Sequence, residues 1–187
     1  MMKIDLILNE NAGKGKGFDE AFIVKYRNEN AKPTNEIWIA YCKDEKEIRK
    51  AAENKHVDVI LGLEEAERRD SLHGKNSGLN EVICNLAKKN NIALGFSFGK
   101  ILHSNNKAML LGRMMQNVEF CRKYKVRMLL ASFAESKWDV RSYNELFSFG
   151  SALGMTPKEV KDSLEMAALI LKEKKEEKLP AGTRLVK

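Results

Sequence analysis

The chain has 187 residues, of which 43% are hydrophobic and 32% charged. This length suits one domain with a substantial core, and the composition excludes collagen-like and fully disordered proteins. The formal net charge of +7 favours an anionic partner. No uncharged apolar run approaches the roughly 18 residues of a membrane span, and the charged start is unlike a secretory signal. We therefore expect one domain over residues 1–187, a charged tail at 172–187, no membrane partner and a cytoplasmic location.

The first half of the chain alternates short apolar runs with helical patterns. Three glycines in five residues make 11–17 a loop, and Asp44 is a good helix N-cap. The expected elements are a strand at Lys3–Leu8, a helix at about Asp19–Arg27, a strand at Glu36–Tyr41, a helix at about Asp44–Asn54, a strand at His56–Leu61, a polar loop at Glu64–Gly78 and a helix at about Leu79–Lys89.

The second half shows clearer periodicity. Pro157 suits the first turn of a helix, and the charge run at 171–178 suits a fraying helix end. The expected elements are a strand at Ile92–Phe96, a helix at Asn105–Lys123, a strand at Arg127–Ala131, helices at Tyr143–Met155 and Pro157–Lys172, and a short edge strand within Leu179–Lys187.

Strands separated by helices of this length predict repeated βα units and a largely parallel sheet. An open doubly wound sheet and a compact (β/α) barrel both fit this pattern. Eight full units would need about 200 residues or more, so a barrel would have some abbreviated units.

The positive charge is unevenly distributed. Residues 1–99 hold 16 basic and 16 acidic side chains, whereas residues 100–187 hold 17 basic and 10 acidic ones. Such a one-sided field suits a polyanion, because each phosphate contact releases condensed counterions. Solvated lysines on helix faces are the other interpretation.

The sequence carries little sign of enzyme chemistry. Its three histidines, His56, His73 and His103, lack metal-ligand spacing, and no GxSxG motif occurs. The three cysteines form no CxxC pair, which excludes a zinc ribbon, and we expect them to be buried as reduced thiols. A carboxylate-only Mg²⁺ site stays open.

The loop Asn9–Gly17 could cradle a phosphate through its backbone amides, with charge from Lys14 and Lys16. Phe18 stands where a Walker A loop needs a hydroxyl. The segment is similar to the opening of diacylglycerol-kinase-type lipid kinases, but the chain lacks the Gly-Gly of their nucleotide loop. We favour a flexible connector whose two lysines could contact a phosphate backbone.

Two polar segments follow the strands at Ile92–Phe96 and Arg127–Ala131. In parallel α/β folds, loops at the carboxyl ends of strands gather on one rim. This rim has cations and an aromatic but few acids, which suits phosphate and base contact. For Trp138, core packing is favoured over base contact. The rim residues are Ser97, Lys100, His103, Ser104, Ser132, Lys137, Trp138, Asp139 and Arg141.

Short motifs follow one another in a specific order along the second half. They are Ile92–Ser97, Ser104–Asn105, Leu111–Met115, Lys123–Val126, Ser132–Ser136, Trp138–Arg141 (WDVR) and Gly154–Met155, preceded by Val57–Ile60, Arg69–Asp70 and Gly78–Leu79 and followed by Pro180–Val186. Over about residues 56–187 the chain resembles the ribonuclease P protein family known in archaea as protein component three. The first 55 residues match that family poorly, and Asn80 and Glu81 stand where it commonly has Asp-His.

The resemblance implies a TIM-barrel-like (β/α) fold, here with abbreviated N-terminal units. It implies a subunit of ribonuclease P, the endoribonuclease that removes 5′ leaders from precursor tRNA. The catalyst would be the RNA, with Mg²⁺ bound to it. The chain itself would contribute no catalytic residue and bind no cofactor or metal. The implied partners are ribonuclease P RNA, the small component-two subunit and other ribonuclease P proteins, with precursor tRNA contacted indirectly.

We expect phosphate contact from a set of basic residues in which arginines act as forks and lysines as point charges. Two other hypotheses stay open: a stand-alone, metal-dependent phosphoesterase barrel, and a protein-docking module without RNA binding. The predicted RNA-binding residues are Arg69, Lys100, Arg113, Arg122, Lys125, Arg127, Lys137 and Arg141.

Overall fold

Six short strands, all paired in parallel, form the centre of the described part of the chain. The computed structural model describes residues 2–27, 36–65, 70 and 76–176. The strands are β1 (Ile4–Ile7), β2 (Glu20–Ile23), β3 (Ile39–Tyr41), β4 (Val59–Leu61), β5 (Ala93–Ser97) and β6 (Arg127–Ala131). The helices are α1 (Glu45–Glu53), α2 (Glu81–Lys89), α3 (Phe98–His103), α4 (Lys107–Tyr124), α5 (Tyr143–Ala152) and α6 (Pro157–Glu176), with 3-10 turns η1 (Glu10–Ala12) and η2 (Leu63–Glu65).

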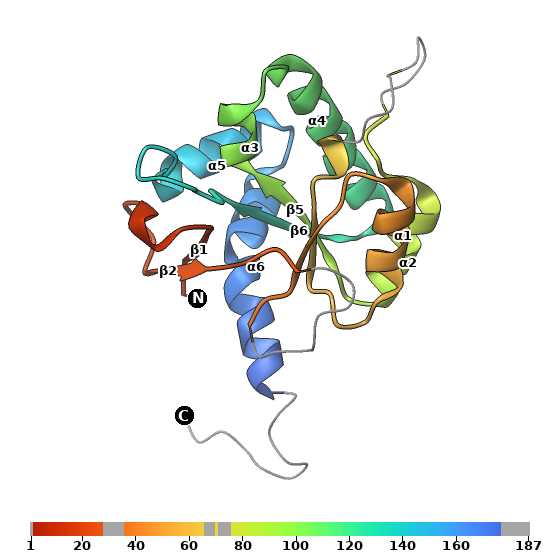
Figure 1. Ribbon diagram of the computed structural model, residues 1–187, viewed down its shortest axis with the longest axis horizontal. Helices are drawn as coiled ribbons and strands as arrows, with labels where there is room; N and C mark the ends of the chain where they lie inside the picture. Colours follow the sequence, from red (N-terminus) through yellow and green to blue (C-terminus); the bar gives the residue numbers. More distant parts are fainter. Residues whose placement is uncertain (1, 28–35, 66–69, 71–75, 177–187) are drawn as a thin grey trace.

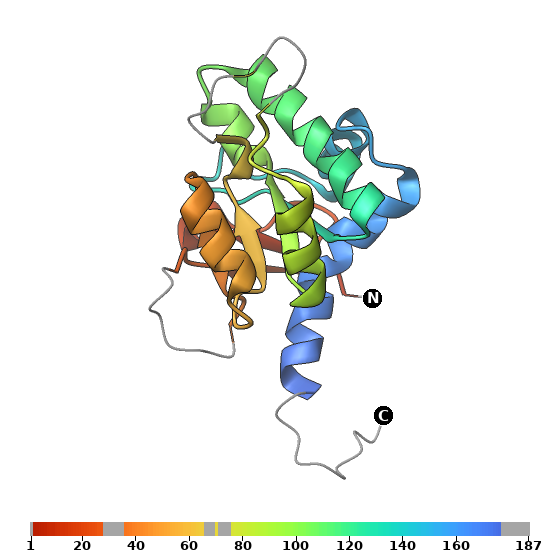
Figure 2. The same ribbon diagram turned by 90° about the vertical axis from the view of Figure 1, so that its right-hand side faces the viewer.

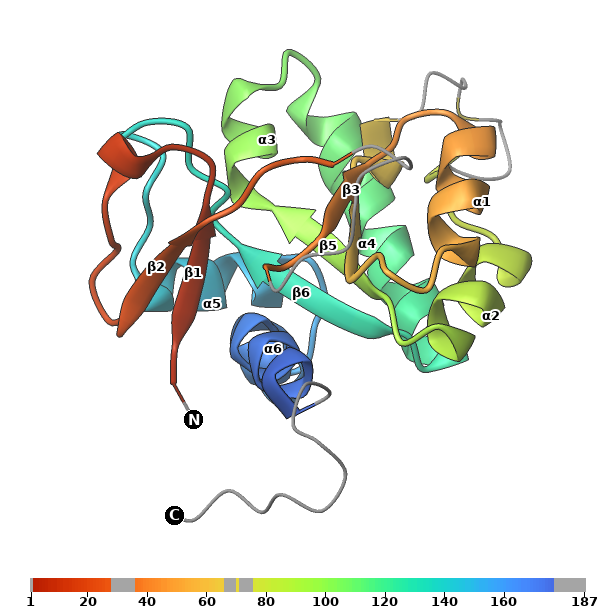
Figure 3. The same cartoon turned by 60° about the horizontal axis from the view of Figure 1, so that its bottom comes forward.

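The strands form two sheets, β1-β2 and β3-β4-β5-β6, and backbone contacts join the sheets at both edges. Tyr26, just after β2, forms a parallel bridge to Ile39 in β3. Ile7 in β1 forms a second parallel bridge to Ala134, just after β6. The strands therefore follow one another around a closed ring (Figure 3). The predicted TIM-barrel-like fold is confirmed, in a version with short strands.

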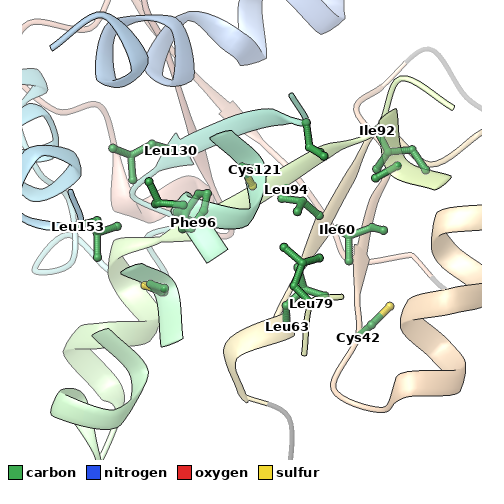
Figure 4. Close-up of a cluster of buried hydrophobic side chains, with 14 of the residues drawn as sticks. Cys42, Ile60, Leu63, Leu79, Ile92, Leu94, Phe96, Cys121, Leu130 and Leu153 are labelled. Atoms are coloured by element: carbon green, nitrogen blue, oxygen red, sulfur yellow. The ribbon is translucent and has the colours of Figure 1, made fainter. Parts of the chain in front are cut away.

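Alternate strand residues supply two hydrophobic clusters, because side chains along a strand point to opposite faces. Ile60, Leu94 and Phe96 point outward and pack among residues from α1, α2, α4 and α5 (Figure 4). Val59 and Leu129 point to the other face, where the inward side chains of β1 meet Met166, Ala167 and Ile170 of α6. Through these three residues α6 covers β6 and β1 on the second face, while its first turns pack against α5 (Figure 1).

Local capping explains where the helices begin. Asp44 and Asn80 accept hydrogen bonds from the backbone N–H groups of the first turns of α1 and α2. Ser142 and Glu145 form a capping box at the start of α5, and Pro157 occupies the first turn of α6. Three of the helices, α1, α2 and α4, lie side by side on one face of the sheet (Figure 2).

The structure corrects the predicted helix at Asp19–Arg27. Residues Glu20–Ile23 form β2 and pair in parallel with β1, with Leu6 opposite Phe22. The structure also adds α3, six residues after β5 that begin where the Ser97 hydroxyl accepts a hydrogen bond from Lys100 N at 3.2 Å. The last helix continues to Glu176, beyond the expected end at Lys172. The strand expected within 179–187 lies outside the described residues.

Two expectations about the interior can be compared with the structure. Cys42, Cys84 and Cys121 are all buried thiols that form no disulfide within the described residues, as predicted. Burial raises the pKa of the Cys84 thiol to about 11, which disfavours the reactive thiolate. Among the described helices, none has the length and hydropathy needed to cross a membrane.

Candidate RNA-binding surface

The two polar segments predicted to share a rim lie next to each other. Gly99 N donates a hydrogen bond to the Ser132 carbonyl at 2.9 Å, which joins the start of α3 to the end of β6. Farther from the sheet, His103 Nε2 lies 3.1 Å from Asp139 Oδ1. The prediction that the carboxyl ends of β5 and β6 bring these segments together is confirmed.

Residues 135–141, called here the Trp138 loop, present a tryptophan to solvent. The Trp138 residue is 76% exposed, so the expectation of core packing is wrong. Its neighbour Asp139 is 4% exposed and holds the loop from within. Asp139 Oδ2 accepts hydrogen bonds from Glu135 N, Ser136 N and Ser136 Oγ at 3.2, 2.9 and 3.0 Å. Burial works to raise the Asp139 pKa, but these bonds and His103 outweigh it and lower the pKa.

The two predicted cations of this loop have different surroundings. Arg141 turns back on its own loop, where its guanidinium donates to the carbonyls of Trp138 and Val140 at 2.8 and 2.7 Å. The same guanidinium lies 4.9 Å from the ring centre of Phe98. Lys137 is exposed and places its ammonium 5.0 Å from the ring centre of Trp138. Arg141 therefore supports the loop, whereas Lys137 faces solvent beside the tryptophan.

Lys100 lies at the mouth of the ring, against two stacked tyrosines. The rings of Tyr26 and Tyr41 have centres 4.8 Å apart, and Lys100 Nζ lies 5.9 and 4.7 Å from them. Tyr41 donates its hydroxyl to Glu65 at 2.5 Å, and Lys43 pairs with the same carboxylate at 3.0 Å. Lys100 is half-buried by this cluster, so only part of the side chain faces solvent.

Arg113 lies in the interior, 1% exposed, although its charge made it a predicted RNA contact. Its guanidinium donates to Asp70 Oδ1 and to the Glu64 carbonyl, both at 2.9 Å. A fully enclosed fork cannot reach a phosphate without rearrangement, so we take Arg113 out of the RNA-binding set. Next to it, burial raises the pKa of the Glu64 carboxyl to about 7.

Three predicted cations lie at the opposite end of β6 from the Trp138 loop. Arg122, Lys125 and Arg127 line a groove of about 330 Å³ between α4, β6 and α6. Arg122 is held by Glu159 through two bonds of 2.8 and 2.7 Å. This pairing, with its hydrogen bond, is the main reason that the Glu159 pKa is lowered to about 2.

Arg127 is also held by α6, while Lys125 faces solvent. Two guanidinium nitrogens of Arg127 donate to the two carboxylate oxygens of Glu173 at 2.8 and 2.9 Å. A phosphate at Arg122 or Arg127 would have to share the fork with these carboxylates. Lys125 is exposed in the left-handed conformation that ends α4. The predicted cations are thus divided between two ends of the strands, and Arg69 lies outside the described residues.

The glycine-rich loop after β1 contacts the Trp138 loop, which the sequence did not predict. Lys16 accepts a hydrogen bond at its carbonyl from Tyr143 N at 2.9 Å. A Cβ at Gly15 would lie 1.9 Å from the Arg141 carbonyl oxygen, so the two backbones touch. Glycine at every second position was the signal, since such spacing permits close approach of another backbone. In the described residues, no group of three His, Cys, Asp or Glu side chains is placed to hold a metal ion.

Comparison with known proteins identifies the chain's family. The model of a family described as RNase P subunit p30 matches residues 26–179. The chain belongs to the RNase P subunit p30 family. The match begins about 30 residues earlier than the resemblance had indicated, so the p30 family pattern also includes β3 and α1, and the expectation that the first 55 residues match the family poorly is corrected for residues 26–55.

Individual relatives agree with membership of the p30 family. Ribonuclease P protein component 3 of Methanosarcina mazei is 29% identical over 160 residues, which cover 84% of this chain and 60% of that protein. Its counterpart in Thermococcus gammatolerans is 36% identical over 92 residues, covering 48% of this chain and 43% of that protein. The chain therefore spans about 60% or less of the length of these relatives.

A solved structure supports the fold. A chain of the cryo-EM structure of archaeal ribonuclease P with mature tRNA matches with a TM-score of 0.66 and 22% identity. The match covers 81% of this chain and 64% of that chain. This likeness shows that the two chains share a fold over most of the length of this chain.

Proposed function

We propose that the chain is a protein subunit of ribonuclease P, binding and positioning the catalytic RNA for removal of 5′ leaders from precursor tRNA. The observation that carries the proposal is the p30 family match over residues 26–179. The excess of basic residues in the second half supports it, because a protein that binds folded RNA must neutralise phosphates.

In this proposal the RNA is the catalyst and carries the Mg²⁺, and the chain contributes no general acid, general base or nucleophile. Its partners are ribonuclease P RNA, the small component-two subunit and the other ribonuclease P proteins, with precursor tRNA contacted indirectly. The complex works in the cytoplasm. The protein stabilises the folded RNA, which lowers the Mg²⁺ concentration that the RNA needs.

The surroundings of each basic side chain rank the RNA-binding candidates. Lys125 and Lys137 are exposed and are the strongest phosphate contacts in the predicted set. Lys100 contributes a half-buried charge at the mouth of the ring. Arg122, Arg127 and Arg141 contribute through charge while their forks hold protein groups. Arg69 stays in the set on its sequence position alone.

Reconstitution tests this function. Ribonuclease P RNA is assembled with the other protein components, with and without this chain, and leader removal is measured at limiting Mg²⁺. We expect the chain to raise the cleavage rate at low Mg²⁺. An unchanged rate, together with no binding to ribonuclease P RNA at low salt, would leave the protein-docking hypothesis. Metal-dependent phosphodiester cleavage by the purified chain alone would favour the phosphoesterase.

Charge reversal tests the surface itself. Lys125→Glu and Lys137→Glu should each weaken binding to ribonuclease P RNA and flatten its dependence on salt by roughly one counterion. Lys46→Glu is the matched control, because Lys46 is exposed on α1, a helix away from both the end of α4 that carries Lys125 and the Trp138 loop that carries Lys137 (Figure 1). If Lys46→Glu weakens RNA binding as much as the other two variants, Lys125 and Lys137 make no specific phosphate contact and contribute only to the overall positive charge of the protein.

A further inference from the structure

The Trp138 loop exposes a tryptophan beside the lysines of the neighbouring glycine-rich loop, and the family assignment does not explain this arrangement. An exposed tryptophan is costly in water, and large apolar groups left exposed beside charges mark binding sites. Trp138 is 76% exposed, whereas the other tryptophan of the chain, Trp38, is 2% exposed. The contrast makes Trp138 a candidate contact residue.

The tryptophan is presented by a fixed scaffold. Asp139 holds the backbone of residues 135 and 136 from the inside, and His103 of α3 contacts the same carboxylate. Arg141 donates to the Trp138 carbonyl from the other side. Because both flanks are bonded, the loop loses little conformational entropy when a ligand binds.

Residues 13–17, called here the Gly/Lys loop, add cations to the same surface. The two loops lie side by side at the carboxyl ends of β1 and β6 (Figures 1 and 3). Gly15 lies directly against the Arg141 backbone, and its neighbours Lys14 and Lys16 are both exposed. Lys14 Nζ donates to the Asp19 carbonyl at 3.1 Å, which directs that side chain along its own loop.

Most acidic side chains near the two loops are buried or accept hydrogen bonds from protein groups. The Asp139 carboxylate is buried, and the Glu145 carboxylate accepts bonds from Ser142 N and Oγ, both at 2.7 Å. Asp19 accepts a bond from Lys3 N at 2.7 Å. Glu135 is exposed and is the opposing charge of the Trp138 loop. Lysines therefore dominate the field around the tryptophan.

We propose that the Trp138 loop and the Gly/Lys loop form one binding surface for an unpaired segment of RNA. Trp138 stacks on a base, and Lys137 and Lys16 contact the flanking phosphates. Aromatic stacking beside lysines is how proteins bind single strands, whereas lysine is depleted from protein–protein interfaces. A duplex cannot offer an unstacked base, so the surface selects single strands. This inference rests on the proposed function and names the part of the RNA that is bound.

Intrinsic fluorescence tests the stacking directly. The full 187-residue chain is titrated with a single-stranded RNA 10-mer and with the same sequence as a duplex. Stacking on Trp138 should quench the tryptophan emission with the single strand only. Trp138→Phe should remove the quenching and keep most of the affinity. Trp138→Ala should weaken binding by roughly fivefold or more, as expected for loss of one stacked base.

Lysine variants test the second part of the surface. Lys16→Ala and Lys137→Ala should each reduce the salt slope of single-strand binding by roughly one, whereas Lys46→Ala should leave it unchanged. Quenching that is absent, or equal affinity of the wild type and Trp138→Ala, would overturn this inference. In that outcome, retained binding to ribonuclease P RNA would leave the proposed function intact. Loss of both would count against the proposed function itself.

Discussion

Asp5 in β1 accepts two hydrogen bonds from Ser132, which lies 127 residues later, just after β6. Ser132 N donates to Asp5 Oδ1 at 2.8 Å and Ser132 Oγ donates to Asp5 Oδ2 at 2.6 Å. Both residues are fully buried. This side-chain contact accompanies the backbone bridge between Ile7 and Ala134 and closes the ring between β1 and β6.

Ser132→Ala should therefore destabilise the protein by about 1–3 kcal/mol, because it removes a donor from a buried carboxyl. Urea unfolding at pH 7 measures the change. Ser148→Ala is the control, since the Ser148 hydroxyl is exposed and bonds only to the Asn144 carbonyl within α5. A loss no larger than that of the control would mean that the ring closes without the Asp5–Ser132 contact.

Stability should decline as pH rises from about 4 to about 7. Burial raises the pKa of Asp5 from 3.8 to about 6 and that of Glu64 from 4.5 to about 7. Between the unfolded and folded values the folded state binds more protons, so raising the pH removes stability, by up to about 3 kcal/mol for each group. Glu159 acts in the opposite direction at the acid end, because its pKa is lowered from 4.5 to about 2 in the folded protein, so the unfolded state binds more protons up to roughly pH 5.5. Above that pH Glu159 is ionised in both states and adds no slope.

Glu64→Gln removes the contribution of Glu64 to the pH dependence of stability and leaves that of Asp5. The variant should flatten the decline between pH 4.5 and 7 and should be more stable than the wild type at pH 8. Urea unfolding at pH 4.5, 6 and 8 provides the measurement. Glu119→Gln, on the exposed face of α4, should reproduce the wild-type curve. A Glu64→Gln curve parallel to the wild type would show that Glu64 is ionised in the folded protein without penalty.

Arg113→Ala should cost about 3 kcal/mol or more, since it empties a buried site and leaves the Glu64 carbonyl without its donor. Thermal unfolding followed by circular dichroism measures this loss. Lys125→Ala, which changes an exposed cation at the end of the same helix, should stay within about 0.5 kcal/mol. Near-equal stabilities of the two variants would indicate that the Arg113 side chain is accessible and return it to the RNA-binding set.

Gly15→Ala should displace the Trp138 loop, because the added Cβ would approach the Arg141 carbonyl oxygen to 1.9 Å. We expect a loss of about 1–3 kcal/mol and a shifted emission maximum of Trp138, with the buried Trp38 as the constant background. Lys16→Ala, which changes the residue after Gly15, should alter neither the stability nor the emission maximum of Trp138. An unchanged emission spectrum in Gly15→Ala would show that the two loops move independently.

Several elements could be predicted from local patterns alone. The strands β5 and β6 and the helix α4 were placed to within two residues, because each combines an apolar run or stripe with clear ends. The helix predicted at Asp19–Arg27 was wrong, since β2 exists through its pairing with β1, a contact that periodicity cannot register. The short helix α3 was missed because its six residues give too little periodicity to detect.

By itself the sequence determined the parallel α/β class, the one-sided positive charge and the ordered motifs of the family, since these depend on residue types and spacing along the chain. Only the tertiary structure decided what each motif residue does. It enclosed Arg113, turned Arg141 back onto its own loop and exposed Trp138. The reason is physical: burial and ion pairing depend on which distant segments meet, and that information is absent from any local stretch of sequence.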